Sequence, residues 1–175
     1  LRVKAIHARR DPLYHALLPG DMEHELLMGM PREPTIHAEV SALCPCLDVR
    51  ITRGGCSWLH GAVKIRKERA GDGRLAVEAA LRCHSSMKHV FVVDEDINLD
   101  DPLSLEWAMA TRFQASLDLM IFEDQKGSSL DPSADPATRR TTKVGFDLTV
   151  PLGADRRAFR RVPPPVEIDL DDYLP

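Results

Sequence analysis

An acidic cluster directly follows a short apolar run near the middle of the sequence. The stretch HVFVV (89–93) leads into Asp94, Glu95 and Asp96. Carboxylates at the carboxyl end of a strand could bind a metal ion or transfer protons, because open α/β sheets gather their ligands there. Successive side chains of a strand point to opposite faces, so the three acids do not converge easily. Alternatively, the three acids only mark the point where a buried strand ends and the chain turns into the next helix. The residues alone leave both interpretations open.

The segment 125–141, QKGSSLDPSADPATRRT, is a second candidate. It lacks apolar periodicity, and loops of this length in compact domains are usually functional or disordered. Its Gly-Ser-Ser could offer backbone N–H groups to an anion, but it matches neither a P-loop nor a nucleophile elbow. Its Asp-Pro pairs equally suit an ordered surface loop. A further interpretation is a hydrolase-like enzyme with Ser129 as its nucleophile. No His or Asp lies at a diagnostic motif position to support it.

The cysteines offer a loose zinc set formed by Cys44, Cys46, Cys56 and His60. Their spacings match none of the common structural sites, which pair ligands as C-x2-C or a similar knuckle. We therefore expect free, mostly buried thiols in a reducing cytoplasm. The histidines are scattered along the chain, and we interpret most of them as surface or packed side chains.

The composition is that of an ordinary globular protein. The chain has 175 residues, a net charge of −4, 43% hydrophobic and 29% charged residues. This length suits one domain, and the negative charge without a basic block argues against nucleic-acid binding. The apolar runs are too short to span a membrane, and the first residues do not read as a signal peptide. We expect a cytoplasmic protein, and the lack of an initiator Met fits either a domain cut from a longer chain or a chain whose start is missing.

Hydrophobic periodicity places the candidate residues on alternating strands and helices. The expected strands are 1–9, 47–51, 58–66, 89–94, 117–124 and 143–149. The expected helices are 23–28, a second one whose start is marked by Pro31 and Thr35, 75–83 and 102–113.

Turn and cap signals support this division. Gly29 is predicted to cap the first helix at its C-terminus, and Asp101 with Pro102 to begin the last one. The second and third strands are predicted to form a hairpin. Because HVFVV is apolar at every position, we expect it inside a sheet covered on both faces. The pattern indicates a layered α/β domain, followed from Pro151 by a Pro-rich, acidic and peripheral tail.

Several motifs together resemble the C-terminal part of the UbiD family of decarboxylases. They are VDEDIN (93–98), EWAMATR (106–112), GSSLDPSA (127–134) and TKVGFDLT (142–149), with RDPLYHALLPGDMEHELLMGMPRE (10–33) and GGCSWLHGAVKIRK (54–67) upstream. The resemblance implies an α/β layered domain over 1–150, with a mixed central sheet flanked by helices, and a tail over 151–175. It also implies reversible (de)carboxylation of aromatic, heteroaromatic or α,β-unsaturated acids with prenylated FMN, whose chemistry the cofactor supplies.

The resemblance further implies what this chain lacks. In the family, the catalytic Glu-Arg-Glu set, the ligands of a divalent metal such as Mn and most of the cofactor pocket lie upstream, in a split β-barrel domain. We therefore expect no catalytic residue in this chain and no activity from it alone. It would be a fragment or separate subunit that closes over the flavin, joins the barrel domain and forms homo-oligomer contacts. The alternative is a non-catalytic assembly or regulatory module.

The family pattern assigns pocket residues to two segments of this sequence. Ser128, Ser129 and Leu130 match a loop that lines the substrate pocket, and two serines there suggest a polar or water-bridged substrate. Met87 and Lys88 match a strand entrance that faces the same pocket.

The pattern also points to a site for a monovalent cation such as K⁺. Arg112, Asp147 and Thr149 match positions where some members bind such an ion, partly through backbone oxygen, and oxygen ligands suit a hard cation.

Overall fold

The computed structural model describes residues 1–16 and 22–162. Its strands are β1 (Cys46–Ile51), β2 (His60–Ile65), β3 (His89–Val93), β4 (Leu119–Lys126) and β5 (Arg140–Leu148). Its α-helices are α1 (Met22–Gly29), α2 (Glu33–Ser41), α3 (Asp72–Cys83), α4 (Pro102–Arg112) and α5 (Ala115–Asp118), with short 3₁₀ helices at Met30–Arg32, Arg53–Gly55 and Arg156–Phe159. None of the helices described is long and apolar enough to cross a membrane.

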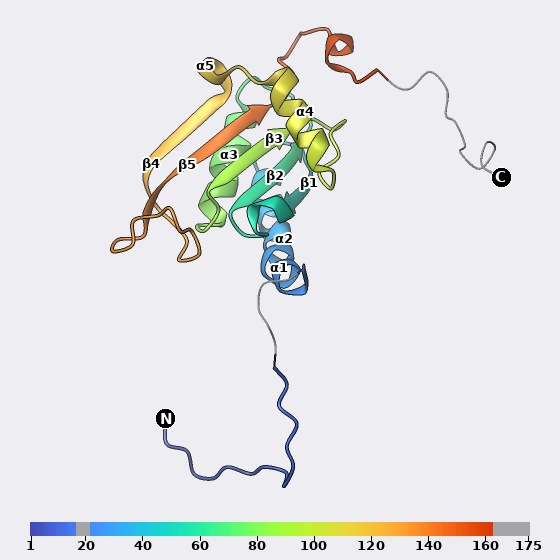
Figure 1. The fold of residues 1–175 in the computed structure, drawn as a ribbon. Coiled ribbons are helices and arrows are strands. Elements are labelled where there is room, and N and C mark those ends of the chain that lie inside the picture. Colours follow the sequence, from blue (N-terminus) through green and yellow to red (C-terminus); the bar gives the residue numbers. More distant parts are fainter. Residues whose placement is uncertain (17–21, 163–175) are drawn as a thin grey trace, which may run out of the picture.

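The strands form one sheet in the order β1-β2-β3-β5-β4 (Figure 1). The three central strands β2, β3 and β5 are parallel, and the outer strands β1 and β4 are antiparallel to their neighbours. The predicted mixed sheet flanked by helices is therefore confirmed, as is the β1–β2 hairpin. The parallel centre puts the starts of β2, β3 and β5 along one edge of the sheet and their ends along the opposite edge.

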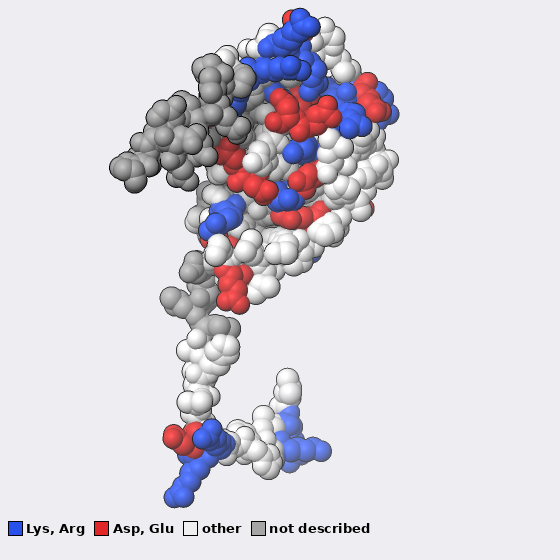
Figure 2. Space-filling view, turned by 90° about the vertical axis from the view of Figure 1, so that its right-hand side faces the viewer, with Lys and Arg blue, Asp and Glu red and all other residues white. Residues whose placement is uncertain are grey.

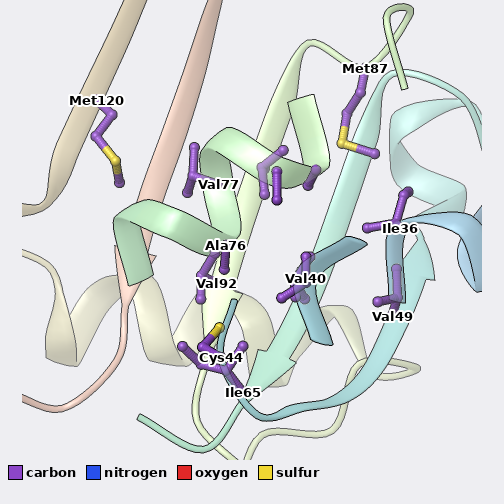
Figure 3. Close-up of a cluster of buried hydrophobic side chains, with 14 of the residues drawn as sticks. Ile36, Val40, Cys44, Val49, Ile65, Ala76, Val77, Met87, Val92 and Met120 are labelled. Atoms are coloured by element: carbon purple, nitrogen blue, oxygen red, sulfur yellow. The ribbon is translucent and has the colours of Figure 1, made fainter. Parts of the chain in front are cut away.

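Helices cover the two faces of the sheet unequally. On one face α2 and α3 pack over the central strands and enclose the larger core, to which β3 contributes Val90 and Val92 (Figure 3). On the other face α4 packs against a smaller core that contains Val93. Since β3 is buried on both sides, its uninterrupted apolar sequence fits its central place. The half-buried Phe91 and Phe146 stack on the α4 face at a ring separation of 5.1 Å.

Helix α4 begins as its sequence predicts. The Asp101 carboxylate accepts a hydrogen bond from the Leu103 N–H at 3.0 Å, and Pro102 occupies the first turn. A side-chain acceptor at this position satisfies a backbone donor that the helix leaves unpaired.

One local prediction is wrong and a second holds only in part. Residues 1–9 form no strand; this segment is exposed, and Val3 and Ile6 are 70% and 86% accessible. The alternating pattern supplies one face of a strand, but a strand also needs backbone partners, and none of the described strands pairs with it. Helix α1 ends at Gly29, yet Gly29 has φ −80°, so it is not a left-handed cap. Glycine suits this position because a Cβ atom would lie 2.6 Å from the Ser57 carbonyl oxygen.

Candidate functional site

The loop between β4 and β5 lies at the edge of the sheet where the parallel strands begin. Its base is closed by a hydrogen bond of 2.8 Å from the Gly127 N–H to the Arg139 carbonyl. Within it, Asp131 is only 3% exposed. The ammonium group of Lys88, just before β3, lies 2.9 Å from the Asp131 carboxylate and also donates to Ser133. The predicted long loop is thus an ordered structure tied to the central strand.

Asp131 organises the loop around its carboxylate. The backbone N–H and the hydroxyl of Ser133 donate to one carboxylate oxygen at 3.0 and 2.8 Å. Burial by itself would raise the pKa of Asp131, but the hydrogen bonds from Lys88 and Ser133 outweigh it and lower the pKa to about 2. The carboxylate therefore stays ionised through the neutral range, and the ion pair with Lys88 persists there.

The structure brings most of the predicted pocket residues to this edge. Ser128 is buried and its hydroxyl accepts a hydrogen bond of 3.1 Å from the Trp58 indole N–H. Ser129 and Leu130 are exposed, Leu130 by 57%. Met87 is fully buried in the core between the sheet and α2–α3 (Figure 3). That these residues line a substrate pocket stays a prediction.

A histidine pair that the sequence analysis did not single out lies at the same edge. The His89 Nδ1 and His60 Nε2 atoms are 2.8 Å apart, because the two residues are register partners on β2 and β3. Burial lowers the pKa of His60 to about 4, assisted by His89 and Lys88, and burial followed by Lys88 lowers the pKa of His89. The alternation of His89, Phe91 and Val93 could have shown from the sequence that these side chains share one face of the strand. That His89 lies beside His60 follows only from the pairing of the two strands.

His60 gives the fold an expected sensitivity to acid. Its folded-state pKa of about 4 lies below the value of about 6.5 of an unfolded histidine, so the unfolded chain binds more protons between these values. Stability should therefore fall as pH falls through this window. Urea denaturation at several pH values should show a shallower decline for His60→Phe than for the unmodified chain. Parallel curves would mean that His60 titrates normally in the folded state.

His60 also borders a pocket of about 890 Å³ between α1, β1 and α4. Its walls are mainly apolar and include Leu26, Met30, Phe91, Leu105 and Met109. Acidic and basic side chains are interspersed over the side of the molecule that carries β1 (Figure 2).

The charges that line this pocket do not suit the phosphate of a flavin mononucleotide. The lining includes the acids Glu25, Glu33, Asp100 and Glu106 and the bases Arg50 and Arg53. Arg50 is already bound to Asp48 and Asp100 at 2.5 and 2.9 Å. Because the acids outnumber the bases, a phosphate dianion would be repelled there. These residues do not fit the role of holding the cofactor.

The acidic cluster at the opposite edge has a structural partner. Arg112, at the end of α4, donates to Asp94 at 2.9 Å and to Asp96 at 2.6 Å, and the Val150 N–H donates to Asp94 at 2.7 Å. Glu95 points elsewhere and pairs with Arg66 at 3.2 Å. Burial raises the pKa of Asp94, whereas the hydrogen bond from Arg112 lowers the pKa of Asp96. The acids end β3 and hold α4 and the segment after β5 against it.

The three residues predicted to bind a monovalent cation lie in two groups. Arg112 is engaged with the acidic cluster, while Asp147 and Thr149 both bind the ammonium group of Lys67, at 3.2 and 2.8 Å. Within the described parts of the chain, no three or more His, Cys, Asp or Glu side chains gather as a metal site. The cysteines are free thiols. A cation site at Arg112, Asp147 and Thr149 stays a prediction.

The sequence profile of the 3-octaprenyl-4-hydroxybenzoate carboxy-lyase C-terminal domain, UbiD_C, matches residues 25–148. The chain belongs to the UbiD family. The resemblance noted from the motifs is thereby confirmed, and the matched region includes β1 to β5 and both edges of the sheet.

Known proteins extend the match along the chain. The anhydromevalonate phosphate decarboxylase of Methanothermobacter thermautotrophicus is 48% identical over 163 residues, which are 93% of this chain and 38% of that enzyme. The UbiD-class enzyme HmfF from Pelotomaculum thermopropionicum in complex with FMN superposes with a TM-score of 0.85 and 39% identity, covering 95% of this chain and 38% of that one. An evolved dimeric form of HmfF in complex with prFMN superposes with a TM-score of 0.74 and 35% identity, covering 95% of this chain and 35% of that one. The chain thus spans about 38% of the length of the curated relatives it matches.

Proposed function

We propose that this chain is the C-terminal lobe, as a fragment or a separate subunit, of a reversible UbiD-type decarboxylase that uses prenylated FMN. The observation that carries the proposal is its 48% identity, over nearly its whole length, to an anhydromevalonate phosphate decarboxylase. The substrate class is accordingly a phosphorylated α,β-unsaturated acid. The aromatic acids named in the sequence analysis are the second choice, supported by a gallate decarboxylase of Lactiplantibacillus plantarum at 30% identity.

In this proposal the cofactor, the catalytic residues and any Mn belong to a split β-barrel domain or subunit, whereas K⁺ would bind at the site predicted at Arg112, Asp147 and Thr149 of this chain. This agrees with the excess of acids in the pocket beside β1, which does not suit a flavin phosphate. The cofactor, when bound by that partner, acts as the electron sink for the loss of CO₂. The lobe closes over it, contributes homo-oligomer contacts and acts in the cytoplasm.

The part of this lobe that meets the substrate is the loop edge. Leu130 projects with 57% of its surface exposed, while Asp131 beside it is fixed by Lys88. An exposed apolar side chain on a fixed backbone suits the selection of substrates by shape. A non-catalytic assembly module is the competing function, and it requires no defined position for Leu130.

Purified full-length enzyme distinguishes these two functions. Intact-complex mass spectrometry should find the cofactor mass together with the barrel-domain mass, and incubation with anhydromevalonate phosphate should release CO₂. A colourless homo-oligomer without cofactor or turnover would favour the assembly module.

Leu130→Ala should change substrate preference in the full-length enzyme and leave the flavin bound. One truncated side chain in an apolar contact is expected to alter discrimination by about 1–3 kcal/mol, and selectivity should move accordingly. The measurement is the ratio of kcat/KM for two acids of different size, with flavin absorbance as the control. Loss of flavin absorbance in the variant would contradict a role confined to substrate contact.

A further inference from the structure

We infer that Trp58 is a positioning residue that sets where Leu130 projects at the loop edge, acting through Ser128. The inference rests on the proposed function for its catalytic consequence, but its structural content concerns only this chain. It makes a side chain that follows the GGCS turn a determinant of substrate selectivity.

Ser128 connects the two residues through a single oxygen atom. Its hydroxyl accepts from the Trp58 indole N–H at 3.1 Å and from the Leu130 backbone N–H at 3.1 Å. Ser128 is only 3% exposed, so water does not readily replace either donor. Since an indole N–H can only donate, removing it leaves this buried hydroxyl, among the residues that the structure describes, with only the Leu130 N–H, a bond within the loop itself. Its tie to a residue outside the loop is then lost.

Trp58 itself is held from the helix side of the molecule. Its ring meets the His84 ring edge-on at a centroid distance of 4.7 Å, and its carbonyl oxygen lies 3.1 Å from His84 Nε2. The Arg32 guanidinium lies over the indole at 5.7 Å. A tryptophan with contacts of this kind has little rotational freedom, so its N–H is a fixed reference point for the loop.

The backbone before Trp58 is in an unfavourable conformation. Cys56 and Ser57 both have positive φ, 58° and 47°, although neither is glycine. The buried Ser57 hydroxyl has no hydrogen-bond partner among the described residues. Strain of this kind persists only where the surroundings demand it, and it is concentrated at functional segments. Here the strained turn delivers the indole to Ser128.

The ion pair of Lys88 with Asp131 has a different role from the Trp58–Ser128 contact. It holds the loop as a whole against β3, whereas the Trp58–Ser128 contact acts on the residue directly before Ser129 and Leu130. Removing the indole N–H should therefore loosen the tip of the loop and leave its attachment intact.

The test compares Trp58→Phe with Trp107→Phe in full-length enzyme. Phenylalanine retains an aromatic ring against His84 and Arg32 but lacks the N–H donor. Trp107, the other tryptophan, lies on α4 beside Arg112 and Arg161 and provides the matched control. Hydrogen exchange of the Leu130 amide, measured without substrate, should become about three- to tenfold faster in Trp58→Phe, the equivalent of one lost hydrogen bond. Trp107→Phe should leave it unchanged.

The catalytic readout is selectivity between anhydromevalonate phosphate and an analogue lengthened by one methylene. Trp58→Phe should shift the ratio of the two kcat/KM values in the same direction as Ser128→Ala, and the double variant should add nothing further because the two residues act in series. Unchanged selectivity together with a lowered melting temperature would overturn the inference, since it would show a merely structural tryptophan.

A failure of the proposed function can be distinguished from a failure of the inference about Trp58. If the unmodified full-length enzyme releases no CO₂, the proposed function is wrong, and the exchange of the Leu130 amide still decides whether Trp58 positions it. An exchange rate that is equal in Trp58→Phe and the unmodified enzyme would overturn the positioning role. Should Trp58→Phe fold poorly, Arg32→Met, which removes a contact of the indole and leaves Ser128 in place, gives the decision through the same Leu130 amide.

Discussion

Replacing Arg112 with methionine should lower the free energy of unfolding by about 3–5 kcal/mol, because it leaves the buried Asp94 carboxylate without the cation that lies nearest to it. Asp94 is 1% exposed and Arg112 4% exposed. Methionine retains the apolar stem of the side chain but removes the guanidinium, which also lies over the Trp107 ring at 5.0 Å. Arg156, 3.4 Å from Asp94 and half exposed, cannot substitute fully. Urea denaturation at neutral pH measures the effect.

Arg66→Met is the matched control for this prediction. Arg66 pairs with Glu95, the neighbouring acid of the same cluster, but its side chain is 60% exposed. Exposed ion pairs contribute about 0–1 kcal/mol, so this variant should remain close to the unmodified chain. If both arginine variants lost the same small amount of stability, the buried network would not be the element that holds α4 to β3.

Lys88→Met should destabilise the chain by about 3 kcal/mol at neutral pH, because Asp131 would remain buried and ionised without its partner. The folded-state pKa of Asp131 is about 2, below that of an unfolded aspartate at about 3.9. The stabilisation by this pair is therefore present above pH 4 and is lost as pH falls toward 2. The difference between variant and unmodified chain should shrink over the same range.

Urea denaturation at neutral and acidic pH measures both parts of this prediction. Lys126→Met, which removes an exposed lysine at the end of β4 close to the same loop, is the control and should have little effect at either pH. A destabilisation by Lys88→Met that stayed constant down to acidic pH would show that lost packing, not the ion pair with Asp131, was responsible.

The elements of this fold were largely predictable because their signals are local. The apolar run of β3 and the Asp101-Pro102 start of α4 each depend on a few consecutive residues, and both predictions are confirmed. The predictions that failed in whole or in part depended on distant residues. The alternation in 1–9 required a neighbouring strand. Position 29 requires a glycine because of the Ser57 carbonyl, which only the folded chain brings near.

The candidate site was predictable only in part for the same reason. The loop was identifiable as residues 125–141 from its length, close to the 127–139 of the structure. Its anchor on Lys88 and its contact with Trp58, in contrast, join residues far apart in the sequence. His60 and His89 are 29 residues apart in the sequence, so predicting their contact would have required the register of the two strands. The acidic cluster was visible at once, but its partner Arg112 lies on the following helix, so its structural role depended on how α4 returns to β3.

The closure of the loop at its base has a consequence for how this family can diversify. Because the Gly127 N–H to Arg139 carbonyl bond joins the two stems, the residues between them form a separate ring on the sheet. Doubling the length of such a ring costs only about 0.6 kcal/mol of chain entropy. Insertions and substitutions there can accumulate without changing the register of β4 and β5. If the loop meets the substrate as proposed, such changes would alter the substrate range and leave the sheet unchanged.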